Sequence, residues 1–399
     1  MSELVFEGLK VLDVGSWIAG PVAATILADY GADVIKIEPP GAGDGYRALC
    51  ASPIMPAASV NYCWDMDARN KRSLTLNLKH AEGQAILLRL LADADVCVTN
   101  LPLSLRRTLR LTYDDIGAQF PRLIYASLTA YGESGPERDR EGFDLVAYWS
   151  RTGLMDLVRA PGAPPTQSLP GMGDHPTAVA LYGAIATALY RRERTGRGSH
   201  VHTSLLANGL WSASCIAQGE FAGADFSAWR SPARGSAMRF LYRSADDRWL
   251  QFTMVRTPEE FQRLLNVVGL LDLLDDPRFA TPEARLASGA ALGQILADRL
   301  ALHTSEHWMA AFAAARVPAA LAGRLEDLPT DVQILQNGMV LDAARTGTYP
   351  LINHPVNVAD VPRAPLRPAP RLGAHSAAIL DSLGYGAGDI ERLRADGGI

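Results

Sequence analysis

Residues 10–38, KVLDVGSWIAGPVAATILADYGADVIKIE, contain two short apolar runs separated by a helical stretch. Val11–Val14 predicts a strand, and Pro21 suits the first turn of the helix that follows it. Gly31 ends that helix, and Val34–Glu38 predicts a second strand. The sequence therefore predicts a β-α-β unit near the start of the chain.

The same alternation of helix and strand continues beyond this unit. Helices are predicted over residues 81–92, 113–119 and 177–194, and apolar strands follow them at 96–98, 123–128 and 201–204. Strands that alternate with helices form a parallel sheet that is covered on both faces. The predicted fold class is α/β, with a doubly wound parallel sheet.

The pattern changes after Gly223. Residues 240–243 and 249–252 flank a polar turn and predict a β-hairpin, and helices are predicted at 257–268, 282–302 and 305–315. Near the end of the chain, prolines predict an extended segment before two short helices at 376–383 and 387–395. We expect an α/β domain over residues 1–225, a small α+β domain over 226–325 and a C-terminal part over 326–399.

The composition argues against several classes of function. The chain has 399 residues, of which 48% are hydrophobic and 20% charged, and a formal net charge of −5. Nucleic-acid binding needs a basic face, and a membrane span needs about 20 consecutive apolar residues, so neither partner is expected. The first ten residues lack a basic segment followed by an apolar one, which argues against a secretion signal. We expect a cytoplasmic protein.

Sequence motifs for a resident cofactor or metal are missing. The first β-α turn, Gly15–Pro21, lacks the G-x-G-x-x-G spacing, and no G-x-x-x-x-G-K-[ST] motif occurs. The 4 cysteines have no metal-ligand spacing. We therefore expect no metal and no permanently bound cofactor, although the amides at the start of a helix can still attract an anionic ligand.

Two groups of cations lie in the N-terminal domain. The segment Asn70–Lys79 contains three cations around an alternating strand, and it predicts either a solvated edge or a polyphosphate site in which Arg72 or Lys79 supplies the charge. Arg106, Arg107 and Arg110 are expected in a loop after strand 96–98, at the carboxyl edge of the sheet where α/β folds bind ligands.

A glycine-rich loop, Ser168–Thr177, carries Asp174 just before the long helix. One interpretation is that Asp174 is a turn or capping residue. The other is that Asp174 is a nucleophile, whose charge the helix N-terminus stabilises while backbone amides of the loop donate to an oxyanion. His175 is adjacent, but neighbouring residues rarely point the same way. No pattern for a serine, cysteine or zinc hydrolase is present, so carboxylate chemistry is the main candidate.

The ordered combination of several motifs resembles the class III CoA-transferases, which include formyl-CoA, carnitine-CoA and succinyl-CoA:carboxylate CoA-transferases and are related to α-methylacyl-CoA racemase. The matching residues run nearly from end to end: GLKVLD 8–13, AGP 19–21, LADYGADVIKIE 27–38, NKRS 70–73, GD 173–174, RTGRG 194–198, DPRF 276–279, PRLGAH 370–375 and LGY 383–385.

The resemblance implies a Rossmann-like large domain built from both chain ends, an inserted small domain and an interlocked homodimer. It implies that Asp174 is the nucleophile. An acyl-CoA thioester would acylate Asp174 to an acyl-aspartyl anhydride, the CoA thiolate would convert this to an aspartyl-CoA thioester, and a carboxylic acid acceptor would then receive the CoA. CoA is thus a substrate, and the chemistry needs no metal.

The resemblance also implies contacts with CoA. Residues that match the family's CoA-binding segments are Ile18, Ala19, Leu76, Asn77, Leu78, Lys79, Asn100, Leu101, Arg107, Arg140 and Phe143, and Arg72 is added from the cation pattern. The loop that contains Arg107 departs from the family's Asn-Phe-x-Pro-Gly pattern.

Two departures from the family bear on the reaction. Ile18 stands where formyl-CoA transferases have a glutamine, which favours a larger and less polar acyl group. The racemase branch has a Gly-His-Asp motif where this chain has Gly142-Phe143-Asp144, and phenylalanine cannot carry a proton. A CoA-transferase is therefore the main hypothesis. A racemase-type isomerase and a non-catalytic CoA-binding protein are the alternatives.

Overall fold

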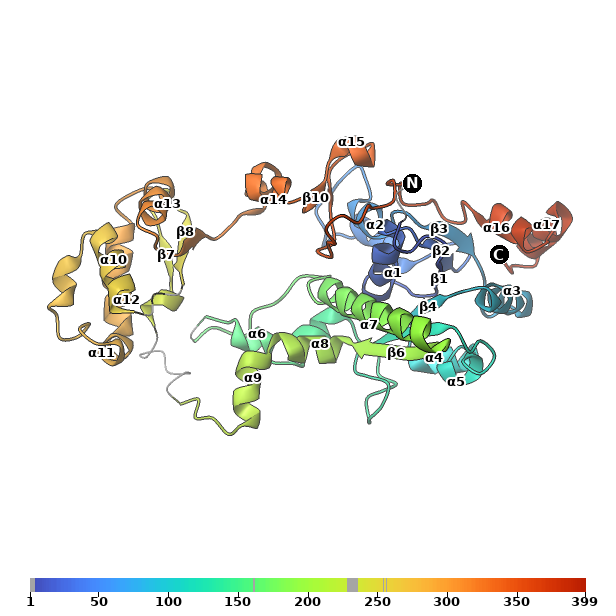
Figure 1. Ribbon diagram of the computed structural model, residues 1–399, viewed down its shortest axis with the longest axis horizontal. Helices are drawn as coiled ribbons and strands as arrows, with labels where there is room; N and C mark the ends of the chain where they lie inside the picture. Colours follow the sequence, from blue (N-terminus) through green and yellow to red (C-terminus); the bar gives the residue numbers. More distant parts are fainter. Residues whose placement is uncertain (1–3, 161, 228–235, 254, 256) are drawn as a thin grey trace. The chain divides into compact units, whose positions relative to one another are not determined.

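The computed structural model describes residues 4–160, 162–227, 236–253, 255 and 257–399 (Figure 1). The chain divides into two compact units, one formed by Met1–Gln218 with Gln336–Ile399 and the other by Gly219–Leu335. The second unit is wider at both ends than the small domain expected over 226–325. The first unit contains both ends of the described chain.

A six-stranded parallel sheet forms the centre of the first unit, in the order β3-β2-β1-β4-β5-β6. Its strands are β1 (Lys10–Asp13), β2 (Asp33–Glu38), β3 (Arg72–Thr75), β4 (Val96–Thr99), β5 (Ile124–Thr129) and β6 (Ser199–Ser204). The α/β class with a parallel sheet is confirmed. Strands β2 and β3 follow β1 on one side, and β4, β5 and β6 extend the sheet on the other side. The direction in which strands are added therefore reverses between β1 and β4.

Both faces of this sheet are covered because alternate strand residues point to opposite sides. Val11 and Val34 face helices α1 (Ala19–Asp29) and α7 (Asp174–Thr195), whereas Leu12 and Ile35 belong to a core built with α3 (Ala81–Ala92), α16 (Ser376–Ser382) and α17 (Ala387–Ala395). The C-terminal segment joins the sheet's edge, where Ser376 Oγ accepts from the Thr75 amide at 3.1 Å.

Shorter elements complete the description of this part of the chain. They are η1 (Gly45–Ala51), α2 (Tyr62–Asp67), α4 (Leu103–Thr108), α5 (Tyr113–Ile116), the π-helix η2 (Leu145–Ser150), α6 (Leu154–Leu157), α8 (Leu205–Ser212), α9 (Ser214–Phe221), β10 (Val340–Leu341), α15 (Ala343–Thr346) and β11 (Leu351–Ile352). The expectation of a loop around Arg106 and Arg107 was wrong, because both lie in α4.

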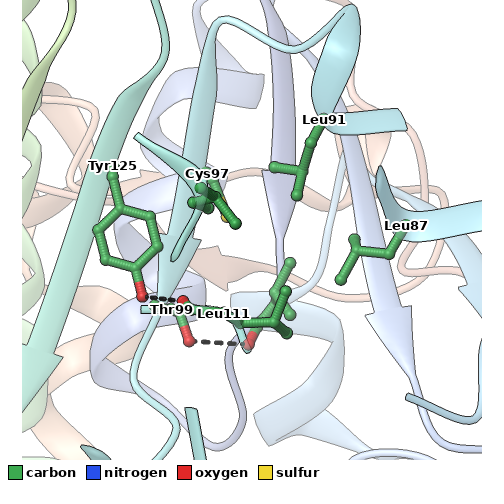
Figure 2. A pocket seen from close by; sticks show the side chains of 8 residues that line it. Leu87, Leu91, Cys97, Thr99, Leu111 and Tyr125 are labelled. Atoms are coloured by element: carbon green, nitrogen blue, oxygen red, sulfur yellow. Dashed lines mark hydrogen bonds between the residues drawn. The ribbon is translucent and has the colours of Figure 1, made fainter. Parts of the chain in front are cut away.

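A small void in the first unit is enclosed by residues of α3, β4, α5 and β5 (Figure 2). Its volume is about 10 Å³, close to that of one water, and leucines and Cys97 line most of it. The polar groups at its wall are already satisfied: the Tyr125 hydroxyl donates to the Leu111 carbonyl at 2.7 Å, and Thr99 donates to the Val14 carbonyl at 3.2 Å. The void is a packing feature and not a ligand site.

The second unit has a three-stranded antiparallel sheet, β7 (Leu241–Arg243), β8 (Trp249–Phe252) and β9 (Ala319–Leu321), with β8 in the middle. Its helical elements are η3 (Ala237–Arg239), α10 (Pro258–Val268), η4 (Leu271–Leu274), α11 (Pro282–Ala287), α12 (Gly289–Leu300), α13 (Ser305–Ala314), η5 (Leu325–Thr330) and α14 (Val332–Gln336). The hairpin expectation was correct, but the helix expected over 282–302 is interrupted at Ser288. In the described residues, no helix combines the length and apolar character that a bilayer span requires.

Candidate active site

A cavity of about 550 Å³ lies at the carboxyl edge of the parallel sheet. This is the point between β1 and β4 where the strand order reverses, the usual ligand position in open α/β sheets. The residues that line it are Ser16–Ala19, Leu49, Ile54, Asn100–Leu103, Leu128–Ala130, Arg138–Leu145, Pro170, Asp174 and Leu205. A second cavity of about 400 Å³ shares Ser16 and Leu101 with it. The two cavities are neighbours.

Side chains from distant segments fix the backbone of the turn after β1 through hydrogen bonds. The Asn100 amide group accepts from the Ser16 N–H and donates to the Ser16 carbonyl, both at 2.7 Å. Asp44 accepts from the Trp17 N–H at 2.9 Å, and Trp17 has a φ of +63°, in the left-handed region. Its ring meets Phe143 edge to face at 5.4 Å, so these two aromatic side chains form part of the cavity wall.

A buried network of charges lies beneath this turn. Lys36 contacts Asp44 at 2.8 Å and donates to the Gly15 carbonyl at 2.6 Å. Lys71 contacts Asp13 at 2.9 Å, and all four charged side chains are 2% exposed or less. Burial opposes the ionisation of Asp13, but Lys36 and Lys71 outweigh it and keep the Asp13 pKa below its ordinary value. Lys71 therefore supports the fold and does not face either cavity.

Asp174 is the first residue of α7 and lines the larger cavity. The helix begins here rather than at Thr177, and its N-cap is Gly173, so the capping role does not fall on Asp174. Burial raises the pKa of the half-buried Asp174 carboxyl to about 7, helped by the charges of Asp144 and Asp67 and opposed by His175. The site thus presents a carboxyl group that titrates near neutrality, a property that is concentrated at functional sites.

The loop before Asp174 needs a glycine at position 173. The Gly173 amide donates to Asp144 Oδ2 at 3.0 Å, and a Cβ atom on Gly173 would lie 2.6 Å from Tyr148 Cγ and 2.9 Å from Asp144 Cβ. Sequence reasoning missed Asp144, which follows Phe143 directly, because its contact with the loop joins residues far apart in the chain.

We expect Gly173→Ala to lower the free energy of unfolding by about 1–3 kcal/mol, the usual cost of overpacking. Gly183→Ala in the same helix is the matched control, because nothing lies within 4 Å of its Cβ position. That control should raise stability by about 0.5–1 kcal/mol through helix propensity. Chemical denaturation of both variants tests this, and equal shifts would contradict the steric argument.

Most residues expected to contact CoA lie at the two cavities. Those at the larger cavity, with Asp174, are Ile18, Ala19, Asn100, Leu101, Arg140 and Phe143. Those at the smaller cavity are Leu76, Asn77, Leu78 and Lys79, with Leu101 shared.

Two predicted cationic residues lie elsewhere. Arg72 Nε donates to Asp33 at 2.8 Å, and Arg107 contacts Asp139 at 2.7 Å, and neither arginine lines either cavity. The cation that the structure adds to the larger cavity is Arg138. Within the described ranges, no group of three or more histidine, cysteine or acidic side chains is arranged to hold a metal ion.

Comparison with known proteins identifies the family of this chain. Residues 6–376 match the family described as CoA-transferase family III. The chain is 30% identical over 396 residues to (R)-2-hydroxy-4-methylpentanoate CoA-transferase of Clostridioides difficile, covering 98% of each chain. It is 31% identical over 404 residues to cinnamoyl-CoA:phenyllactate CoA-transferase of Clostridium sporogenes, covering 98% of this chain and 96% of that protein.

A solved structure shares the fold as well. A CAIB/BAIF family protein from Brucella suis has a TM-score of 0.81 and 29% identity, covering 94% of this chain and 98% of that one. The motif resemblance noted from the sequence is confirmed by a family match that spans nearly the whole chain. The chain therefore belongs to CoA-transferase family III and is a CoA-transferase.

Proposed function

We propose that this enzyme moves CoA from an acyl-CoA thioester to a carboxylic acid, with Asp174 as the covalent nucleophile. The observation that carries the proposal is the position of Asp174, a half-buried carboxyl group at a helix N-terminus that lines the 550 Å³ cavity. Here the helix dipole offsets part of the burial that disfavours the carboxylate, and a neighbouring cavity offers space for the rest of the CoA molecule.

The proposed reaction passes through two kinds of activated aspartyl group. A carboxylate oxygen of Asp174 attacks the donor thioester carbon, the C–S bond breaks and CoA leaves as the thiolate, which gives a mixed anhydride. The thiolate then attacks the Asp174 carbonyl carbon and releases the donor acid, which leaves an aspartyl-CoA thioester. The acceptor carboxylate attacks that thioester, the C–S bond breaks, and a second mixed anhydride forms between the acceptor and Asp174. The released thiolate then attacks the acceptor carbonyl carbon of this anhydride, which gives the acceptor-CoA thioester and frees the Asp174 carboxylate. Each step exchanges one activated acyl group for another.

We further propose that the donor carries a bulky, largely apolar acyl group. Trp17, Ile18 and Phe143 line the cavity that contains Asp174, and Leu145 and Leu205 add to this apolar lining. Burial of such a group against these side chains is favourable at roughly 25 cal/mol per Å². Two relatives are named for branched or aromatic substrates, 2-hydroxy-4-methylpentanoate and cinnamoyl-CoA with phenyllactate, which supports the same class.

We also propose that the enzyme is a homodimer. Tyr190 and Trp211 are 66% and 79% exposed, which is unusual for large aromatic side chains and is relieved when a second copy covers them. Light scattering of the purified protein measures this directly, and a monomer at all accessible concentrations would exclude it.

Hydroxylamine trapping tests the covalent route. The enzyme is incubated with a panel of acyl-CoA donors and hydroxylamine, which converts an activated aspartyl group to a hydroxamate, and the peptide of residues 160–191 is examined by mass spectrometry. A donor-dependent hydroxamate on Asp174 is expected. No modified peptide, together with solvent deuterium entering the α-carbon of the acyl group, would instead support the racemase-type reaction.

The rate of this trapping should depend on pH near neutrality. Because burial, Asp144 and Asp67 raise the pKa of Asp174 to about 7 against the opposing charge of His175, Asp174 is mostly protonated and non-nucleophilic below that pH. We expect the rate at pH 6 to be about tenfold below its plateau above pH 8. Single-turnover trapping across this range measures it, and a midpoint near 4, the ordinary aspartate value, would contradict it.

A further inference from the structure

The His175 side chain bridges two acceptors beside the nucleophile. Its Nδ1 atom lies 2.9 Å from the Gly171 carbonyl oxygen, and its Nε2 atom lies 3.3 Å from Asp67 Oδ1. A carbonyl oxygen only accepts, and so does an ionised carboxylate, so each ring nitrogen must carry a proton. The geometry therefore favours a doubly protonated imidazolium at His175.

Buried groups hold the Asp67 end of this bridge. The Tyr46 hydroxyl donates to Asp67 Oδ2 at 2.5 Å, and Tyr46 and Asp67 are 2% and 4% exposed. Burial and the charge of Asp67 raise the pKa of Tyr46, so its hydroxyl remains a donor. Asp67 thus receives one hydrogen bond from Tyr46 on η1 and one from His175 on α7.

The other end of the bridge fixes the loop that leads to the nucleophile. Gly171 has a φ of +86°, and its carbonyl accepts from both the His175 backbone N–H at 3.1 Å and the ring Nδ1. The ring is packed tightly there, because a Cβ on Gly171 would lie 3.3 Å from Nδ1. Asp174 lies between Gly171 and His175 in the chain, within the segment that these two hydrogen bonds hold.

We propose that His175 is a positioning residue: as an imidazolium held by Asp67 and Tyr46, it fixes the Gly171–Asp174 segment and places a positive charge beside the nucleophile. This rests on the proposed role of Asp174. The anions that face this region are Asp67 from α2 and Asp144 before η2, with Tyr46 and Cys63 as the neighbouring neutral groups. Burial disfavours the imidazolium, but Asp67, Gly171 and Asp174 outweigh it and raise the His175 pKa to about 9.

Nitrogen-15 NMR of the wild-type enzyme tests the charge state without any activity measurement. We expect the ring nitrogens of one histidine, assigned by its absence in His175→Gln, to keep the chemical shifts of an imidazolium at pH 7.5. A neutral tautomer for that histidine at pH 7.5 would overturn the proposal. The charge state is read from the wild-type spectrum, and the spectrum of His175→Gln serves only to assign the signal.

Kinetics of the His175→Gln variant test the positioning role. Single-turnover hydroxamate formation on Asp174 should slow by about 100-fold, the effect of a misplacement near 1 Å. Loss of the cation should also move the acidic limb of the pH profile upward by at least about one pH unit. In the double variant His175→Gln/Asp67→Asn an anion is also removed, so the limb should return toward wild type while the rate loss persists.

The exposed His307, in the second unit, provides the matched control, and His307→Gln should keep the wild-type rate and pH profile. An unchanged rate in His175→Gln, or a slower rate with an unmoved acidic limb, would overturn the proposal. Failure of the proposed function is distinguishable, because it would appear as no Asp174 adduct in the wild-type enzyme with any donor.

Discussion

We expect Asp174→Asn to lower the rate of CoA transfer by at least about 1,000-fold, because loss of a covalent nucleophile has effects of this size or larger. The asparagine amide has nearly the same volume as the carboxyl group, but it neither attacks a thioester nor forms an anhydride. Steady-state transfer and hydroxylamine trapping should both fall, while CoA binding measured by calorimetry should stay within a few-fold, because most of the proposed CoA contacts lie on other segments.

Asp156→Asn is the matched control for this experiment. Asp156 is exposed. Among the described residues it forms one ion pair, with Arg159 at 2.7 Å. That variant should retain wild-type transfer. If Asp174→Asn retained transfer while Asp156→Asn behaved as wild type, the covalent mechanism would be wrong, and the cavity would need another nucleophile.

Lys71→Met should lower the free energy of unfolding by about 3–5 kcal/mol, the usual result of removing one partner from a buried ion pair. The network of Lys36, Lys71, Asp13 and Asp44 has no net charge, and the substitution leaves one uncompensated negative charge in the core. It also removes the hydrogen bond that Lys71 donates to the Pro21 carbonyl at 2.7 Å, at the start of α1.

Arg72→Gln tests whether burial rather than charge alone accounts for this loss. Arg72 is the next residue, but its side chain and that of Asp33 are 27% and 44% exposed, so their pair should contribute no more than about 1 kcal/mol. Chemical denaturation measures both variants. Equal losses of stability would show that the buried network is not what distinguishes the two positions.

Elements with strong local signals were predicted well from the sequence. The first β-α-β unit and helix 81–92 match the structure closely because apolar periodicity, glycine and proline act over a few residues. The short strand β9 and helix α4 were missed, since each has only a few residues and depends on its packing partners. The helix expected over 282–302 is interrupted at Ser288, where the dipeptide Ser288-Gly289 was a break signal that the helical periodicity on both sides concealed.

The family and the candidate nucleophile could be recognised from the sequence, because the motifs are short runs of particular residues in a fixed order and can be identified without knowing the fold. Side-chain partners could not, because they join residues that are distant in the chain. Arg72 was predicted to supply charge to a polyphosphate site and instead pairs with Asp33. His175 was given no role from its place in the sequence and instead contacts Asp67, the last residue of α2. Whether a charged residue binds a ligand or supports the core depends on burial and on its partners, and these exist only when the chain is folded.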